Sequence, residues 1–251
     1  MRLAFECGGS GAQLLVLLHG LGATRQVWRP MLEHAAEHWD GSWIAPDLRG
    51  HGASPAATNY SLGCHASDIA ELASEAGGWS EIVVVGHSMG GAVALAAASG
   101  WFGFTPARVF GLGIKVVWRA EEIAKLHEFA STLPRRFATR DEAIARYLKA
   151  SGLAGVVPPA SDIAEAGVVE DSGGWRLAAH PATASVGPPP MLALLAAAQC
   201  PVHLARGETD GLVTLEQLRA CDHGAVSLAG GHNTMVERPA AVWQWLASKL
   251  G

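Results

Sequence analysis

Residues 82–91 read Ile-Val-Val-Val-Gly-His-Ser-Met-Gly-Gly. The four apolar residues at the start predict a short strand buried on both faces, and residues 92–99 are alanine-rich and helical in character. Between them lies the pattern G-x-S-x-G. A strand-to-helix turn this sharp holds its serine at the apex in a strained conformation, and Gly86 and Gly90 leave room for close backbone approach. The stretch therefore predicts a nucleophile, Ser88, with its hydroxyl exposed above the sheet.

Strand-like and helix-like segments alternate on both sides of this turn. Parallel neighbours in a sheet need crossover connections, and helices supply them. We therefore expect an α/β fold with a mostly parallel central sheet covered by helices on both faces. The expected strands are 13–18, 42–45, 82–85, 108–114, 202–205 and 225–228, and the expected helices are 28–39, 61–76, 92–99, 214–221 and a last one beginning at Pro239.

The character of the chain changes between residues 119 and 190. Charged helical pieces at 121–131 and 140–150 are followed by proline and glycine pairs, with little strand signal except around 175–178. We interpret 119–190 as a helical cap inserted into the fold, and 1–118 together with 191–251 as the α/β core.

Composition narrows the kinds of partner. The chain has 251 residues and a formal net charge of −5, and its lysines and arginines are scattered, so no basic face predicts nucleic-acid binding. No secretory signal or membrane-spanning stretch is visible, which favours a cytoplasmic protein without a membrane partner. The four cysteines form no C-x-x-C pair, and we expect them to be reduced thiols. We expect no metal and no organic cofactor, a small-molecule substrate, and a monomer or homodimer.

Five motifs in a fixed order carry a family resemblance. The chain resembles the α/β-hydrolase superfamily over nearly its full length, and especially the capped esterases, enol-lactonases and carbon-carbon hydrolases. The motifs are His19-Gly20-Leu21-Gly22, the segment 47–54 (Asp-Leu-Arg-Gly-His-Gly-Ala-Ser), Gly86 to Gly91, Gly207-Glu208-Thr209-Asp210, and Gly231-His232 followed by Glu237-Arg238-Pro239.

The resemblance implies a catalytic triad. Ser88 would be the nucleophile, His232 the general base and Asp210 the acid that orients the histidine, in the chain order that this fold uses. A serine hydroxyl needs such a base because it is a poor nucleophile at neutral pH. Among eleven histidines the nearest rival to His232 is His223, which precedes the last strand, and Glu208 is the alternative acid.

The resemblance also implies an oxyanion hole. The backbone amides of Leu21, in the loop after the first glycine, and of Met89, after the nucleophile, would stabilise the tetrahedral intermediate. Trp28 and Trp118 are candidate pocket walls beside Met89, although large aromatic residues often simply fill the core. The resemblance assigns Asp47, Arg49 and His51 to organising a loop rather than to chemistry. Three arginines, Arg135, Arg136 and Arg140, either form a solvated helix face, which we favour, or bind a substrate carboxylate.

The predicted function is hydrolysis of a small or medium carboxylic ester or lactone through an acyl-enzyme on Ser88. The alternative with the same triad is cleavage of a carbon-carbon bond in a ketone or diketone. Two further classes stay open. The scaffold could bind a ligand without catalysis, and His34-Ala35-Ala36-Glu37-His38 fits the H-x-x-E-H signature of a zinc peptidase, but without an evident third ligand.

Overall fold

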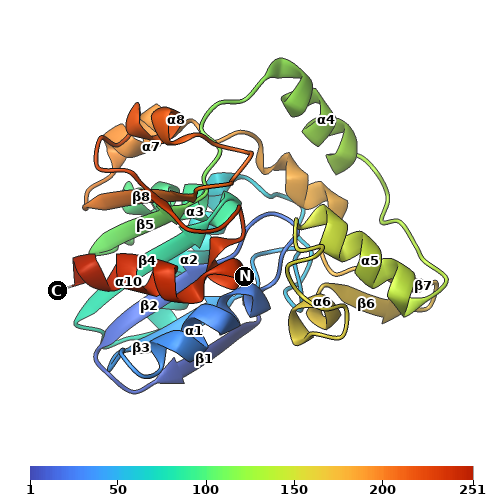
Figure 1. The fold of residues 1–251 in the computed structure, drawn as a ribbon, viewed down its shortest axis with the longest axis horizontal. Helices are drawn as coiled ribbons and strands as arrows, with labels where there is room; N and C mark the ends of the chain where they lie inside the picture. Colours follow the sequence, from blue (N-terminus) through green and yellow to red (C-terminus); the bar gives the residue numbers. More distant parts are fainter. Residues whose placement is uncertain (251) are drawn as a thin grey trace.

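A computed structural model describes residues 1–250 and shows one central sheet of seven strands in the order β1-β3-β2-β4-β5-β8-β9 (Figure 1). All neighbours in it are parallel except β1, which runs antiparallel to β3. The mostly parallel α/β sheet expected from the sequence is thereby confirmed. The strands are β1 (Phe5–Gly9), β2 (Gln13–Leu18), β3 (Ser42–Pro46), β4 (Glu81–His87), β5 (Arg108–Leu112), β8 (Val202–Gly207) and β9 (Val226–Leu228).

Helices cover both faces of the sheet. Leu15 and Leu17 of β2 pack into one core with α1 and α10, and Leu14 and Val16 pack into a second core with α2, α3, α7 and α8, because successive strand residues point to opposite faces. None of the helices in residues 1–250 is both long enough and apolar enough to cross a membrane. The helices of the core are η1 (Arg25–Trp28), α1 (Arg29–Ala35), α2 (Leu62–Ala76), α3 (Met89–Ala98), α7 (Met191–Ala197), α8 (Leu215–Arg219), α9 (Thr234–Glu237) and α10 (Pro239–Leu250).

The segment after β5 forms a separate group of elements beside the sheet (Figure 1). Its members are α4 (Ala120–Ala130), α5 (Arg140–Ala150), α6 (Asp162–Ala166), the hairpin of β6 (Val168–Asp171) and β7 (Gly174–Leu177), and η2 (Pro181–Val186). The two main helices differ in how they are held. In α5, Ile144 and Tyr147 are 2% and 1% exposed and belong to the core, whereas α4 buries no residue and packs against η2. We propose to treat 119–190 as the cap.

Local signals explain where most elements begin. The hydroxyl of Ser61 accepts a hydrogen bond from the amide of Cys64 and caps α2, and Thr139 and Glu142 form a capping box at the start of α5. Several elements have no counterpart in the sequence prediction, namely β1, α6, β6, α7, α9 and the two 3-10 helices η1 and η2. β1 contains two glycines at its end and pairs at the edge of the sheet. The others are only four to seven residues long, so none develops a recognisable period.

Buried neutral histidines predict a loss of stability in mild acid. Burial lowers the pKa of His19 to about 4, and burial together with neighbouring histidines, joined by Arg49 in the case of His65, lowers the pKa of His51 and His65 to about 3. In the unfolded chain these rings titrate near 6.5. Below that pH the unfolded state binds more protons than the folded state, so the free energy of unfolding falls by about 1.4 kcal/mol per pH unit for each histidine.

We expect His65→Leu to flatten this dependence. His65 is fully buried in α2, and neither of its ring nitrogens has a hydrogen-bond partner among residues 1–250. Urea unfolding of both proteins between pH 7 and 5 measures the effect. The variant should lose about 2 kcal/mol less than the wild type over this interval. Parallel pH curves for the two proteins would show that His65 does not remain neutral in the folded state.

Candidate active site

The turn after β4 holds Ser88 in a strained conformation. Ser88 has φ of 50° and is the single non-glycine residue with positive φ in the part of the chain that the structure describes. A Cβ added to Gly86 would collide with the carbonyl oxygen of Gly90, and one added to Gly90 would collide with that of Leu18. The amide of Ser88 donates to the carbonyl oxygen of Leu112 at 2.8 Å. Neighbouring backbone therefore maintains a conformation that costs energy locally.

His232 and Asp210 form a hydrogen-bonded pair. The distance from His232 Nδ1 to Asp210 Oδ2 is 2.9 Å, and the Asp210 side chain is fully buried whereas that of His232 is 21% exposed. The other carboxylate oxygen, Oδ1, accepts from the amide of Leu212 at 2.8 Å. Both carboxylate oxygens are thus engaged, and the ring is oriented through Nδ1. The rivals are placed elsewhere, since Glu208 and His223 are exposed and neither lines the cavity described next.

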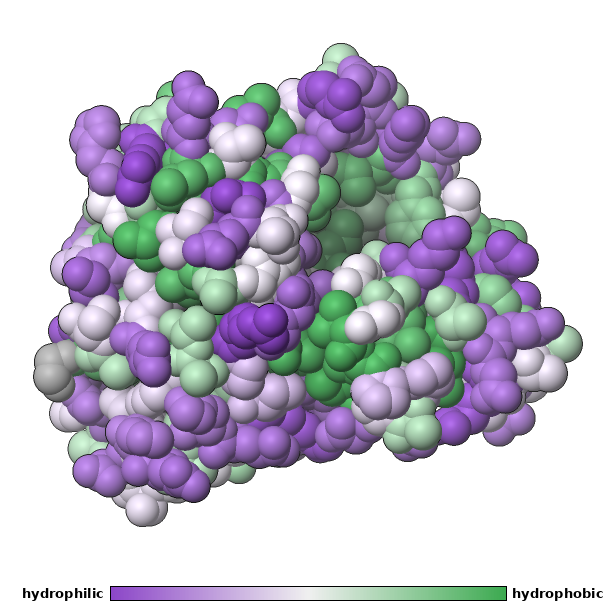
Figure 2. Space-filling view, viewed as in Figure 1, coloured by the Kyte–Doolittle hydropathy of each residue, from purple (hydrophilic) through white to green (hydrophobic). Residues whose placement is uncertain are grey.

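Ser88 and His232 line one cavity of about 430 Å³ at the carboxyl ends of the strands. The cavity floor comes from the core, and its roof comes from the segment after β5. Figure 2 shows the surface hollowed between α4 and α5, with hydrophobic residues in its depth. The lining residues are Gly20, Leu21, Ala23, Leu62, His87, Ser88, Met89, Ala92, Ile114, Lys115, Trp118, Leu126, Lys149 to Gly152, Val186, Gly187, Pro189, Leu212, His232 and Asn233.

The two tryptophans proposed as pocket walls have different environments. Trp118 lines the cavity, and its indole nitrogen donates to the carbonyl oxygen of Lys115 at 3.1 Å. Trp28 does not line it, and that prediction was wrong. Trp28 ends η1, is 0% exposed, and packs in the core with Val27 and Met31. Closeness in sequence to the oxyanion loop does not determine which way a side chain points, and the apolar face of η1 and α1 turns toward the sheet.

Two loops interlock around the expected oxyanion hole. Nε2 of His19 accepts from the amide of Leu48 at 2.9 Å, and Nε2 of His51 accepts from the amide of Gly22 at 3.1 Å. Leu21 is held between these contacts, and its amide donates to no backbone carbonyl of residues 1–250. The amide of Met89 stands in the first turn of α3, where helix amides lack an internal partner. Both residues line the cavity beside Ser88.

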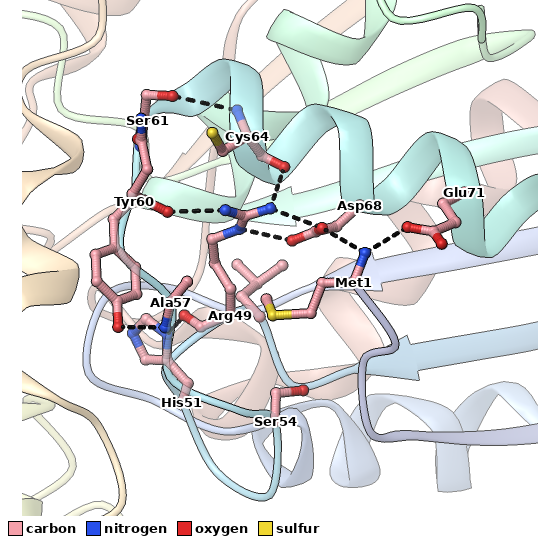
Figure 3. Close-up of polar contacts among 12 residues, drawn as sticks. Met1, Arg49, His51, Ser54, Ala57, Tyr60, Ser61, Cys64, Asp68 and Glu71 are labelled. Atoms are coloured by element: carbon pink, nitrogen blue, oxygen red, sulfur yellow. Dashed lines mark hydrogen bonds and ion pairs between the residues drawn. The ribbon is translucent and has the colours of Figure 1, made fainter.

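The remaining polar residues of segment 47–54 are engaged in structural contacts. The guanidinium of Arg49 donates to both carboxylate oxygens of Asp68 at 2.7 Å and to the carbonyl oxygen of Cys64 (Figure 3). The carboxylate of Asp47 accepts from the amides of Arg25 and Ala53. None of these side chains lines the cavity. This placement agrees with the organising role that the resemblance implies for the segment.

His87 is a site residue that the sequence analysis did not single out. Its Nε2 lies 2.9 Å from the carbonyl oxygen of His232, and the two ring centroids are 4.6 Å apart. Burial is the main cause that keeps the pKa of His87 well below its ordinary value, and the nearby His232 is the second. The His87 ring is therefore neutral and donates its Nε2 proton to the carbonyl oxygen of His232. No local pattern signals this contact, because the partners are 145 residues apart in the chain.

We expect His87→Phe to lower kcat for the proposed hydrolysis by about 10- to 100-fold with little change in KM. The phenyl ring fills the same space but cannot hold the carbonyl of His232. For a general base, the role predicted for His232, a small displacement is costly. Steady-state kinetics of the folded variant measure the effect. His87→Gln retains a side-chain N–H donor and should recover part of the rate. Wild-type kinetics in both variants would contradict this positioning role.

The motif His34 to His38 lies on the surface. The helix α1 ends at Ala35, so the two histidines do not stand on one helix, although their ring centroids are 5.4 Å apart. A zinc peptidase needs both on one helical face together with a third ligand. Within residues 1–250 no group of three histidine, cysteine, aspartate or glutamate side chains is arranged to hold a metal ion.

The strained serine, the histidine–aspartate pair and the mostly parallel sheet define a class of protein, the α/β hydrolases. Residues 15–245 match the family described as the alpha/beta hydrolase family. The chain therefore belongs to that family, and the resemblance seen in the sequence motifs is confirmed.

Individual relatives give a narrower view. Lipase LipV of Mycobacterium tuberculosis is 33% identical over 175 residues, which cover 68% of this chain and 64% of that protein, just under two thirds of its length. A crystal structure of E-2-(acetamidomethylene)succinate hydrolase superposes with a TM-score of 0.79 at 23% identity, covering 98% of this chain and 94% of the other. The thioesterase domain from the curacin biosynthetic pathway gives 0.74 at 22% identity, with 97% and 94% covered. At 22% and 23% identity, these two structural similarities show a shared fold alone.

Proposed function

We propose that the protein is a serine hydrolase that cleaves small or medium carboxylic esters or lactones. One observation carries the proposal. A histidine oriented by a buried carboxylate lines the same cavity as a strained serine. The similarity to a protein named as a lipase supports an ester substrate. Membership of the alpha/beta hydrolase family does not by itself support an ester substrate, because one fold hosts several chemistries.

The residues divide the reaction between them. Oγ of Ser88 bonds to the acyl carbon while Nε2 of His232 accepts the hydroxyl proton of Ser88. The backbone amides of Leu21 and Met89 stabilise the oxyanion that forms on the acyl oxygen. The carbon–oxygen bond to the alcohol then breaks, and His232 returns the proton to the leaving oxygen. Water, deprotonated by the same ring, attacks the acyl-enzyme. The products are a carboxylic acid and an alcohol, and Ser88 regains its proton. Asp210 offsets the charge of the imidazolium at both stages.

The cavity supports a substrate of modest size and apolar character. Its volume of about 430 Å³ falls in the lower part of the range of roughly 300–1,000 Å³ typical of small-molecule sites. Ala92, Ile114 and Leu126 contribute apolar walls, and the charged lining residues are Lys149 and Lys115, of which Lys115 pairs with Glu122 at 2.6 Å. Neutral acyl chains and the alcohol portions of simple esters match the apolar walls.

Two measurements on the purified protein test the proposal. A fluorophosphonate probe should label Ser88, identified by peptide mass spectrometry, and p-nitrophenyl acetate and butyrate and a simple lactone should be hydrolysed. A vinylogous diketone is assayed beside them. Diketone cleavage with negligible ester turnover would replace the proposal with carbon-carbon hydrolysis. If Ser88 is not labelled and no substrate is cleaved, the proposal fails and the protein is a member of the fold that binds a ligand without catalysis.

A further inference from the structure

A second cleft of about 270 Å³ lies between the α4–α5 connection and β7. It shares no lining residue with the catalytic cavity. Its walls are mostly apolar, with two arginines and no aspartate or glutamate. The lining residues are Phe129, Thr132, Leu133, Pro134, Arg135, Phe137, Arg146, Leu177, Ala179 and Pro181.

The arginines of the cleft differ from the others in the cap. Arg136 and Arg176 both pair with Asp171, and Arg140 pairs with Glu165 at 3.0 Å. The two that line the cleft, Arg135 and Arg146, have no ion-pair or hydrogen-bond partner among residues 1–250. Of the three arginines that the sequence analysis considered for a substrate carboxylate, two are therefore paired with acids, and none lines the catalytic cavity.

Both unpaired arginines project from well-anchored backbone. Phe137 and Trp175 exchange two backbone hydrogen bonds, at 2.8 and 3.1 Å, which tie the α4–α5 connection to β7. The guanidinium of Arg135 stacks over the Phe137 ring at 5.1 Å from its centroid. Arg146 precedes Tyr147, which is 1% exposed and holds α5 in the core. A ligand at this cleft would meet two cations whose attachment points are fixed.

The apolar wall of the cleft faces solvent. Leu133 is 88% exposed and Phe129 is 45% exposed. Covering such side chains with an aliphatic chain is favourable, and guanidinium groups match the planar geometry of a carboxylate. An exposed ion pair alone contributes little, so a ligand needs both parts.

We propose that this cleft binds a medium-chain aliphatic monocarboxylate. The carboxylate lies between Arg135 and Arg146, and the chain covers Leu133 and Phe129. Acids of this class are the products of the proposed ester hydrolysis, so the link between this site and the reaction rests on the proposed function. The binding itself rests only on the charge and shape of the cleft.

Calorimetric titration of the full chain with sodium octanoate tests the proposal. Arg135→Gln/Arg146→Gln should weaken octanoate binding at least tenfold, equivalent to 1.4 kcal/mol. The control, Arg136→Gln/Arg140→Gln, removes the same charge from paired residues outside the cleft and should leave the affinity within twofold. Leu133→Ser, at an exposed position that folding does not require, should weaken octanoate binding but leave weak butyrate binding unchanged. Octanol should bind at least tenfold more weakly than octanoate.

Several results would overturn the site. Unchanged octanoate affinity in Arg135→Gln/Arg146→Gln would show that octanoate binds elsewhere. Equal losses of affinity in both double variants would show that octanoate responds to the net charge of the protein and not to this cleft. Octanol binding as tightly as octanoate would remove the role of the arginines. Assays with p-nitrophenyl butyrate separate this proposal from the proposed function. If no protein hydrolyses the ester but octanoate binding still depends on Arg135 and Arg146, the hydrolase assignment fails and the carboxylate site stands.

Discussion

Ser88→Ala is expected to lower kcat for p-nitrophenyl butyrate by about 10⁵- to 10⁶-fold, the scale seen when a serine hydrolase loses its nucleophile. Without the hydroxyl no acyl-enzyme forms, and the residual rate comes from substrate binding and the oxyanion amides acting on water. KM should change little, because the methyl group of alanine leaves the cavity walls in place. The removal of one hydroxyl at a strained turn should not destabilise the fold.

The measurement combines steady-state rates with probe labelling. A control is Ser151→Ala, because Ser151 also lines the cavity but its hydroxyl donates to the carbonyl oxygen of Tyr147 at 2.8 Å. Its kcat should stay within about tenfold of wild type, as for a residue outside the chemistry. If Ser88→Ala retained more than a hundredth of the wild-type rate, Ser88 would not be the nucleophile.

Asp210→Asn is expected to lower kcat by about 10⁴-fold with a nearly unchanged KM. One oxygen of Asp210 accepts from the amide of Leu212 and the other from His232 Nδ1. In the variant the amide oxygen keeps the contact with Leu212, so the NH₂ group faces the imidazole. Nδ1 must then accept a hydrogen bond, and the ring proton moves to Nε2. The base can no longer take the proton of the Ser88 hydroxyl.

Rates measured across pH 6 to 10 check this expectation. The matched control is Glu208→Gln, the exposed acid two residues earlier, which should retain wild-type kinetics. A large loss in Glu208→Gln with a small loss in Asp210→Asn would reverse the assignment of the acid. Thermal unfolding of each variant shows whether a loss of rate reflects a loss of fold.

Much of the candidate site could be predicted because its signals are local. The strained conformation of Ser88 could be predicted from the glycines on either side of it. Neighbouring backbone approaches Gly86 and Gly90 so closely that a Cβ atom would not fit at either position. The pairing of His232 with Asp210 was predicted through family motifs, and the structure brings the two together at 2.9 Å. The direction of Trp28 and the contact of His87 with His232 were not predictable, since neither follows from neighbouring residues.

The sequence by itself determined the architecture of the core and the order of its motifs. The short apolar runs at 14–18 and 82–85 are followed by glycine-containing turns, which favours strands buried on both faces over helices, and both runs form such strands in the sheet. Only the tertiary structure decided which charges found partners. Arg136 pairs with Asp171 at the end of β6, 35 residues further along the chain, whereas Arg146 faces a mostly apolar cleft. Such pairing depends on distances between residues far apart in the chain, which no local pattern encodes.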